Sequence, residues 1–250
     1  MRRLAFANFT SSQSAMDLVY SYIALLLAYL IGSLSFAVIV SRVMGLSDPR
    51  SYGSKNPGAT NVLRSGNKLA AVLTLLLDAL KGYVPVALVQ QYGARLGFAD
   101  TTMAFVGFSA FLGHLFPVFF RFQGGKGVAT AAGVLLAFEP LLGLATLVTW
   151  VAVAALFRYS SLASVVAALL APFFMLLFFD RPILAMAVSA MGLLLIWRHW
   201  RNLANLIAGK ESRLGEKADQ PEPDPKRRRR IRQGHDDRAS SHSSQRSKGN

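Results

Sequence analysis

Three polar segments of this otherwise apolar chain carry residue types that bind anions. The first reads Gly53-Ser54-Lys55-Asn56-Pro57-Gly58-Ala59-Thr60-Asn61-Val62-Leu63-Arg64 and lies between two apolar runs. Its hydroxyls, amides and glycines can present side-chain donors and backbone N–H groups to an anion. On composition alone, a connecting loop with turn residues is an equally good interpretation.

The second segment is Gly124-Gly125-Lys126-Gly127-Val128-Ala129-Thr130, at the start of an apolar run. Glycines let a ligand approach the backbone, a helix N-terminus favours negative charge, and Lys126 adds a full positive charge. It is not a Walker P-loop, because that motif needs Ser or Thr after the lysine and Gly127 stands there. A flexible turn before a helix is the alternative interpretation.

The third segment, Arg198-His199-Trp200-Arg201-Asn202, follows the last apolar run. His199 and Asn202 are three residues apart, so both can lie on one helical face. His199 could serve as a donor, a base or a phosphate ligand, or be an interfacial histidine beside a tryptophan. Ser160 and Ser161 precede another apolar run, where serines are usually helix caps.

These segments must be positioned by membrane helices, because 53% of the residues are hydrophobic, only 16% are charged, and the mean hydropathy is +0.38. Most of the apolar runs have the length that crosses about 30 Å of hydrocarbon. The fourth is short, so it is either a re-entrant half-helix or a crossing whose ends are buried. The runs fall at 18–43, 69–90, 102–120, 128–138, 140–157, 162–179 and 182–198.

The sequence therefore predicts an all-α integral membrane protein with seven transmembrane helices over residues 18–208. A polar N-terminal extension, 1–17, precedes them, and a basic tail, 209–250, follows. The tail contains a basic run at 226–230 and too few apolar residues for a core, so it is predicted to be disordered. It acts either as a solvated orientation determinant or as a contact for anionic lipid headgroups.

The distribution of Lys and Arg predicts the orientation. If all seven runs cross, the loops after the odd-numbered runs share one side and hold most of the basic residues, whereas the opposite loops hold only Arg95 and Arg181. The positive-inside rule then places the N-terminus outside and the C-terminus in the cytoplasm. The net charge of +14 indicates orientation and anionic membrane lipid as a partner, and no nucleic acid. Asp78 and Lys81, inside the second run, are spaced to pair with each other in a structural role.

Some chemistries have no residues to perform them. The chain has no cysteine, which excludes a thiol nucleophile and a Cys-based zinc site. No carboxylate cluster suggests a metal, and we expect neither a metal nor a cofactor. The His-x4-Asp signature of acyl-CoA-type glycerolipid acyltransferases is also missing, since the positions after His114, His199 and His235 hold Phe119, Ala204 and Ser240.

Together the three segments resemble the motifs of the acyl-phosphate-dependent glycerol-3-phosphate acyltransferases, the PlsY type. The second segment resembles the family's motif together with Gly113-His114-Leu115-Phe116-Pro117-Val118-Phe119-Phe120, and the third together with Leu203 and Gly209-Lys210-Glu211. The resemblance covers residues 18–213. It departs at Lys55, where the family usually has glycine, and in the long tail.

The resemblance implies a bacterial inner-membrane enzyme of phospholipid synthesis whose active site faces the cytoplasm. It would transfer an acyl group from acyl phosphate to glycerol 3-phosphate and release phosphate. The resemblance assigns catalytic roles to His199, Lys126, Ser54 and Arg64. It assigns substrate or phosphate binding to Asn56, Thr60, Gly124, Gly125, Gly127, Ser161 and Asn202.

A transporter of phosphate esters or anions is the alternative, because helix ends aimed at an anion also suit transport. A transporter of that kind should show internal repeats and a site near mid-membrane. The chain shows no repeat, and its basic motifs cluster on one predicted side. No oligomeric state follows from the sequence.

Overall fold

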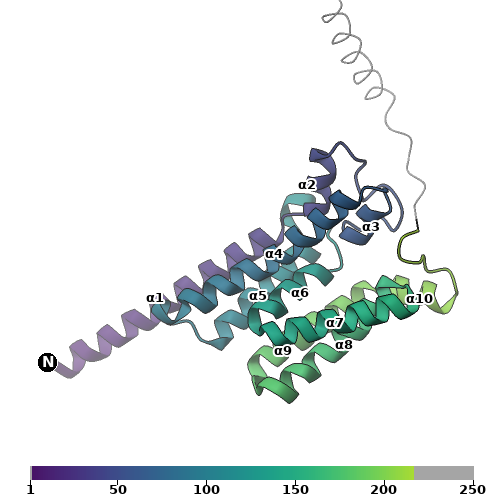
Figure 1. The fold of residues 1–250 in the computed structure, drawn as a ribbon. Coiled ribbons are helices and arrows are strands. Elements are labelled where there is room, and N and C mark those ends of the chain that lie inside the picture. The colour runs from purple at the N-terminus through teal and green to yellow at the C-terminus, as the bar shows by residue number, and fades with distance from the viewer. Residues whose placement is uncertain (1, 217–250) are drawn as a thin grey trace, which may run out of the picture. The chain divides into compact units, whose positions relative to one another are not determined.

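The computed structural model describes residues 2–216, and side chains from residue 16 onward. Every regular element in that range is a helix, and most of the predicted tail lies outside it. The helices (Figure 1) are α1 (Arg2–Gly32), α2 (Phe36–Val43), α3 (Ala59–Leu63), α4 (Lys68–Tyr92), α5 (Asp100–Leu115), α6 (Val128–Phe138), α7 (Pro140–Phe157), α8 (Ser160–Phe179), α9 (Pro182–Arg198) and α10 (Trp200–Ile207), with 3-10 turns η1 (Gly93–Leu96) and η2 (Val118–Phe120).

Within the described range, four helices are long and apolar enough to cross a membrane. If each bent helix pair counts as one span, the number rises to six. The pairs are α1 from Met16 with α2, and α9 with α10. The eleven-residue α6 is apolar but shorter than these. The prediction of an all-helical protein with several membrane-spanning helices is therefore confirmed.

The predicted boundaries of the later helices rest on local signals that the structure bears out. Pro140 and Pro182 stand at the first positions of α7 and α9, where a missing N–H costs nothing. Arg158 and Asp180 end α7 and α8 in the left-handed backbone region. Proline at the start and a left-handed residue at the end thus set short turns between antiparallel helices.

The first predicted span, 18–43, is not one continuous helix. The chain leaves α1 after Gly32 and re-enters α2 at Phe36, with a bend of 43° between the two helices. The Lys81 Nζ donates to the freed carbonyl of Leu34 at 2.7 Å. At its other end, α1 begins at Arg2 and so includes residues of the predicted N-terminal extension.

The predicted pair inside α4 forms, with 2.7 Å between Lys81 Nζ and Asp78 Oδ1. Both side chains are buried, and His114 Nδ1 of α5 lies 3.7 Å from the same carboxylate oxygen. Buried charges are tolerated in a membrane only when they have such partners. The cluster therefore joins α4 to α5 and to the break after α1.

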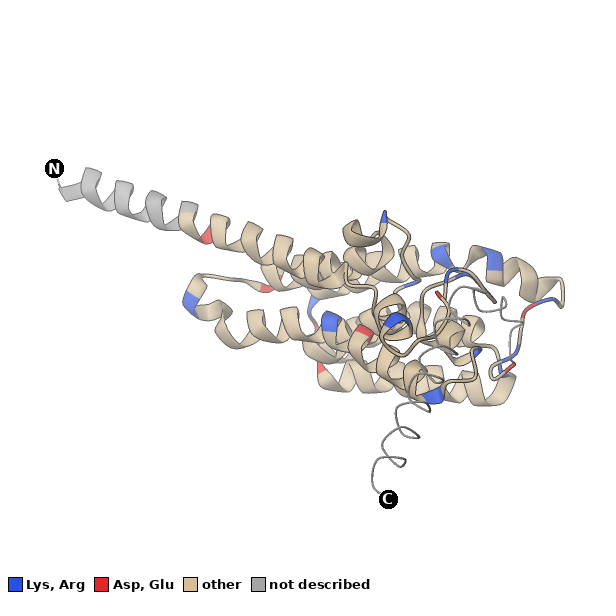
Figure 2. Ribbon diagram, turned by 90° about the horizontal axis from the view of Figure 1, so that it is seen from above, with Lys and Arg blue, Asp and Glu red and all other residues tan. Residues whose placement is uncertain are grey.

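Charged residues lie mainly at the ends of the helices and in the loops (Figure 2). In contrast, large apolar side chains are exposed along the flanks of the helices, as at Leu76, Leu144 and Leu177. Such exposure suits contact with lipid, because hydrocarbon offers these side chains the environment that water does not.

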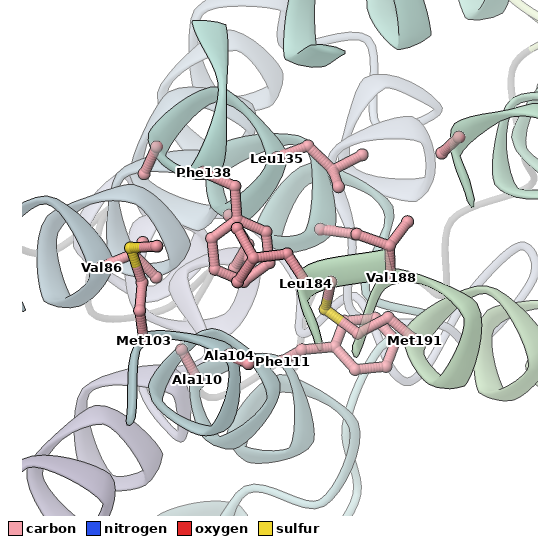
Figure 3. Packing of buried hydrophobic residues seen from close by; sticks show 14 of the residues in the cluster. Val86, Met103, Ala104, Ala110, Phe111, Leu135, Phe138, Leu184, Val188 and Met191 are labelled. Atoms are coloured by element: carbon pink, nitrogen blue, oxygen red, sulfur yellow. The ribbon is translucent and has the colours of Figure 1, made fainter. Parts of the chain in front are cut away.

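The interior is packed by side chains from α4, α5, α6 and α9 (Figure 3), among which Phe111, Phe138 and Leu184 are fully buried. Small residues let the helices approach closely. A Cβ atom at Gly82 or Gly133 would collide with the facing backbone of α6 or α4, respectively. The Thr130 hydroxyl fixes this crossing by donating to the carbonyl of Asp78 at 2.9 Å.

One ion-pair cluster ties together the helix ends opposite the three polar motifs. Arg181, before α9, bonds Asp100 Oδ1 at 2.6 Å and Glu139 Oε1 at 2.7 Å. Asp100 begins α5, and Glu139 lies between α6 and α7. One guanidinium thus links three inter-helix junctions.

We expect Arg181→Ala to lower the thermal unfolding midpoint of the detergent-solubilised protein. The loss should correspond to about 1 kcal/mol of unfolding free energy, because these charged hydrogen bonds are partly exposed to solvent. Arg95→Ala is the matched control, since Arg95 is exposed in η1 and forms no ion pair within residues 16–216. Equal unfolding midpoints for Arg181→Ala and Arg95→Ala would show that the Arg181 ion pairs do not stabilise the fold.

Candidate active site

A cavity of about 590 Å3 opens among α4, α6, α7, α8 and α9, and the three polar motifs meet around it. Its size is typical of pockets that enclose a small molecule. The structure places eight of the eleven predicted site residues on its wall: Ser54, Asn56, Thr60, Arg64, Lys126, Gly127, His199 and Asn202. Gly124, Gly125 and Ser161 lie behind that wall.

The first wall is built by the loop at 53–58 and the short helix α3. Thr60 and Arg64 are four residues apart around α3, so their side chains share one face. The Arg64 side chain has no hydrogen-bond or ion-pair partner in the described part of the chain. An unpaired guanidinium at a cavity wall is suited to bind an anionic group.

Asn61 holds this loop in shape, a role that the sequence did not reveal. Its side chain is buried and donates to the carbonyls of Pro49 at 2.6 Å and Tyr52 at 3.2 Å. Its Oδ1 accepts the backbone N–H of Ser54 at 3.0 Å. Asn61 thus fixes the position of Ser54, although it is itself turned into the loop.

Lys55 lies in the left-handed backbone region, with φ of 55°. Glycine enters this region freely, whereas a side chain adds strain of about 1 kcal/mol. The backbone therefore gives a physical reason for glycine at this position of the motif. Lys55 adopts the same turn at some cost and is exposed.

The second wall is the glycine-lysine loop, residues 124–127, which leads into α6. Packing against α5 requires the glycines of this loop. A Cβ at Gly124 would strike the carbonyls of His114 and Leu115, and one at Gly125 would strike the His114 ring. Gly127 has φ of 87° and faces Phe111. The loop is thereby pressed against α5, and Lys126 projects to the cavity.

A hydrogen-bond chain connects the second and third motifs. Lys126 Nζ donates to Asn202 Oδ1 at 2.7 Å, and Asn202 Nδ2 donates to Glu211 Oε1 at 2.8 Å. The hydroxyl of Ser161, at the start of α8, donates to the same carboxylate oxygen at 2.8 Å. Glu211 therefore fixes both predicted substrate-binding groups.

Glu211 was missed as a site residue, although it belongs to the third motif. It lies in the segment after α10, which is fastened to α7 by the Leu214 N–H and the carbonyl of Arg158 at 2.7 Å. Only the folded chain brings this carboxylate to Ser161, fifty residues earlier. The sequence signal that could have identified Glu211 is its place shortly after His199 and Asn202.

His199 is buried between α9 and α10, and its Nδ1 lies 2.8 Å from the carbonyl oxygen of Leu195. Since a carbonyl only accepts, Nδ1 carries the proton and Nε2 keeps a free lone pair. Burial, followed by the nearby positive charge of Lys126, lowers the pKa of His199 to about 4. At neutral pH the ring is therefore an uncharged acceptor and not a cationic phosphate ligand.

Beyond these polar walls most of the cavity lining is apolar. It continues as a slot between helices that line it mainly with small and aliphatic side chains. These side chains include Val72, Leu75, Ala131, Leu135, Leu147, Val151, Ala168, Ala171, Val188, Met191 and Leu195. A site with a cationic mouth and an apolar interior suits a molecule with an anionic head and a hydrocarbon tail.

The fold and this cavity define a helical membrane protein with a cavity suited to an amphiphilic anion. The model of the family described as glycerol-3-phosphate acyltransferase matches residues 22–209. The glycerol-3-phosphate acyltransferase of Paraburkholderia phymatum is 62% identical over 195 residues, which cover 78% of this chain and 93% of that protein. The enzyme of Burkholderia multivorans is 63% identical over 198 residues, covering 78% and 91%.

Two crystal structures of PlsY (YgiH), an integral membrane glycerol 3-phosphate acyltransferase, are similar to this fold. The glycerol 3-phosphate form is 37% identical with a TM-score of 0.73, and it covers 78% of this chain and 96% of that one. The lysophosphatidic acid form is 36% identical with a TM-score of 0.71, covering 78% and 95%.

The chain belongs to the glycerol-3-phosphate acyltransferase family. It is an integral membrane acyltransferase of the PlsY type, and the resemblance found in the sequence is confirmed. These relatives give no support to the transporter alternative.

Proposed function

We propose that the protein transfers an acyl group from acyl phosphate to glycerol 3-phosphate, giving 1-acyl-glycerol 3-phosphate and inorganic phosphate. One observation carries the proposal: the cation-lined mouth of the cavity continues into an apolar slot. Both substrates are phosphorylated, and one has a hydrocarbon chain. The mouth would hold the phosphates, and the slot would hold the chain.

Two walls share the work of binding in this proposal. Arg64 with Ser54, Asn56 and Thr60 would hold one phosphate from the α3 side. Lys126 and the backbone of its loop would hold phosphate from the α6 side. On the third side, Asn202 would orient the glycerol phosphate directly. Ser161, behind the wall, would act through Glu211, which holds both side chains in position.

Acyl phosphate is already activated, so no covalent enzyme intermediate is needed. A glycerol hydroxyl oxygen attacks the acyl carbonyl carbon, the bond from that carbon to the phosphate oxygen breaks, and the hydroxyl proton leaves. The Nε2 of His199 is placed to accept a hydrogen bond from this hydroxyl, and a phosphate oxygen is the other candidate to receive the proton. The rest of the catalysis is positioning and charge stabilisation.

The test is a purified, detergent-solubilised protein supplied with acyl phosphate and glycerol 3-phosphate. We expect lysophosphatidic acid and inorganic phosphate to form in equal amounts. Phosphate release without lysophosphatidic acid would instead make the protein an acyl phosphatase. No turnover, together with uptake of glycerol 3-phosphate into proteoliposomes, would support the transporter alternative instead.

A pH dependence follows from Lys126 under this proposal. Burial, only partly offset by the charge of Glu211, lowers the pKa of Lys126 to about 8. We expect kcat/KM for glycerol 3-phosphate to fall as the pH rises through about 8, because Lys126 then loses the charge that binds phosphate. Lys126→Arg stays protonated, so its alkaline decline should disappear. The same alkaline decline in both proteins would assign it to another group.

We further propose that the chain crosses the bacterial inner membrane seven times, with α6 as a short crossing. Two observations support this. Seven crossings put the loops of all three motifs on one side, and those motifs line one cavity. The positive-inside rule makes that side cytoplasmic and places the N-terminus outside. The basic segment 217–250, outside the described residues, would follow on the cytoplasmic side.

Single cysteines test this topology, because the chain has none of its own. Cysteines at Ser51 and Gln123 should be labelled by an impermeant reagent only from the cytoplasmic side. A cysteine at Asp180 should be labelled only from the opposite side. All three residues are exposed. Labelling of Gln123 and Ser51 from opposite sides would break the seven-span arrangement.

A further inference from the structure

Arg198, the last residue of α9, donates hydrogen bonds to the glycine-lysine loop from the side away from the cavity. Its Nη2 donates to the carbonyls of Gly124 at 2.8 Å and Gly125 at 3.0 Å, and its Nε lies 3.2 Å from the carbonyl of Gly125. Its guanidinium also lies over the Phe116 ring at 5.9 Å. Unlike Lys126, Arg198 is not among the residues that line the cavity.

These contacts fix which way the loop peptides face. In a trans peptide the carbonyl and the following N–H point in opposite directions. The Gly124 carbonyl points to Arg198, so the Gly125 N–H points away and meets the carbonyl of His114 at 3.1 Å. The Gly125 carbonyl also points to Arg198, so the N–H of Lys126 is turned away from the guanidinium.

The freed N–H groups continue into α6. Among the described residues, the N–H of Lys126 has no hydrogen-bond acceptor, and neither has that of Gly127. The first N–H groups of a helix are also unbonded within it, and here they belong to Val128 and Ala129. All four residues line the cavity. Free amides in sequence beside one lysine form a concave site for an anion.

We propose that Arg198 is a positioning residue that sets this loop for phosphate: it orients the two glycine peptides so that the Lys126 N–H and side chain face the substrate. The proposal rests on the acyltransferase function proposed above. Arg198 does not touch the substrate. It acts from behind the loop, while the His114 backbone and ring hold the other side.

A guanidinium is suited to this task because its donors lie in one rigid plane and so fix the direction of both carbonyls, whereas the three donors of an ammonium group rotate freely. Its charge has a second effect. The positive charge of Arg198 is one of the influences that lower the pKa of Lys126, after burial, the opposed effect of Glu211 and the positive charge of Arg64. Removing the charge should therefore raise the pKa of Lys126, whereas lysine at this position should leave it low.

Arg198→Gln and Arg198→Lys test the proposal, with Arg201→Gln as the matched control. Arg201 lies three residues away in α10, is exposed, and rests on Trp200 at 5.2 Å. Two readouts are used: steady-state kinetics with glycerol 3-phosphate over a pH series, and the rise in thermal midpoint caused by inorganic phosphate. The second readout reports anion binding without requiring turnover.

We expect Arg198→Gln to lose about a hundred-fold in kcat/KM, because misplacing a reacting group by about 1 Å has effects of that size. Its remaining activity should decline at a higher pH than in the wild type, and phosphate should no longer raise its midpoint. Arg198→Lys should keep the wild-type alkaline decline but recover only part of the activity. Arg201→Gln should match the wild type in every readout.

Several results would overturn the proposal. One is an equal phosphate stabilisation of Arg198→Gln and the wild type, and another is an equal loss of activity in Arg198→Gln and Arg201→Gln. If Arg198→Gln does not fold, Arg198→Lys decides, and wild-type kinetics with wild-type phosphate stabilisation in that variant reject the role. An inactive wild-type protein that phosphate still stabilises would count against the acyltransferase function. The positioning role of Arg198 would then be decided by whether phosphate stabilises Arg198→Gln less than the wild type.

Discussion

Replacing Lys126 by alanine should lower kcat/KM for glycerol 3-phosphate by about ten- to a hundred-fold, while the protein remains folded. The ammonium group lies at the cavity wall, 2.7 Å from Asn202 Oδ1, where it can reach a phosphate. A charge-assisted hydrogen bond in a buried site contributes about 1.5–3 kcal/mol, which corresponds to this loss. Steady-state kinetics on purified protein measure it.

Arg64→Ala should show a loss of similar size, because the guanidinium lies on the facing wall of the same cavity. Lys55→Ala is the matched control, since Lys55 is an exposed cation in the same loop as the first motif and does not line the cavity. Normal kinetics in both Lys126→Ala and Arg64→Ala, at normal expression, would take these two cations out of the site.

The later membrane helices could be predicted from sequence because their signals are local. An apolar run bounded by proline or a basic loop marks a span regardless of its neighbours. The break between α1 and α2 could not, because residues 18–43 form one mostly apolar run in which Gly32, Ser33 and Ser35 alone do not mark an interruption. The partner of the freed Leu34 carbonyl is Lys81, which is distant in sequence. Lys81 was expected to pair with Asp78, which it does, but not to compensate for a break in another helix.

The residues of the candidate site also fall into those that local sequence signals predict and those that depend on distant contacts. Lys126, Arg64 and His199 could be found because their side chains have chemistry that a short motif exposes. The positioning roles of Asn61, Glu211 and Arg198 depend on tertiary contacts with other segments of the chain, so their residue types alone do not reveal these roles. The glycines at 124 and 125 show the limit most clearly. Their motif suggested contact with a ligand, whereas the folded chain presses them against α5.

The choice of acyl donor is expected to be the sharpest property of the enzyme: acyl phosphate is used and acyl-CoA is refused. The chain has no His-x4-Asp pair to activate the glycerol hydroxyl against a thioester. Its second wall instead offers the ammonium of Lys126 and the unbonded N–H groups of Lys126 and Gly127. Such a compact group of donors matches a phosphate leaving group and stabilises the charge that develops on it.

A purified, CoA-free assay with the same acyl chain on each donor tests this expectation. Refusal of acyl-CoA should appear as a rate at the background level, with lysophosphatidic acid formed from acyl phosphate alone. A wild-type rate on acyl-CoA would mean that the apolar slot selects the donor by its chain and leaves the headgroup in water. Lys126→Ala then separates the two cases further. If the lysine binds the leaving phosphate, the variant loses activity with acyl phosphate at saturating glycerol 3-phosphate as well, because the missing charge is needed in the transition state and not only for binding the acceptor.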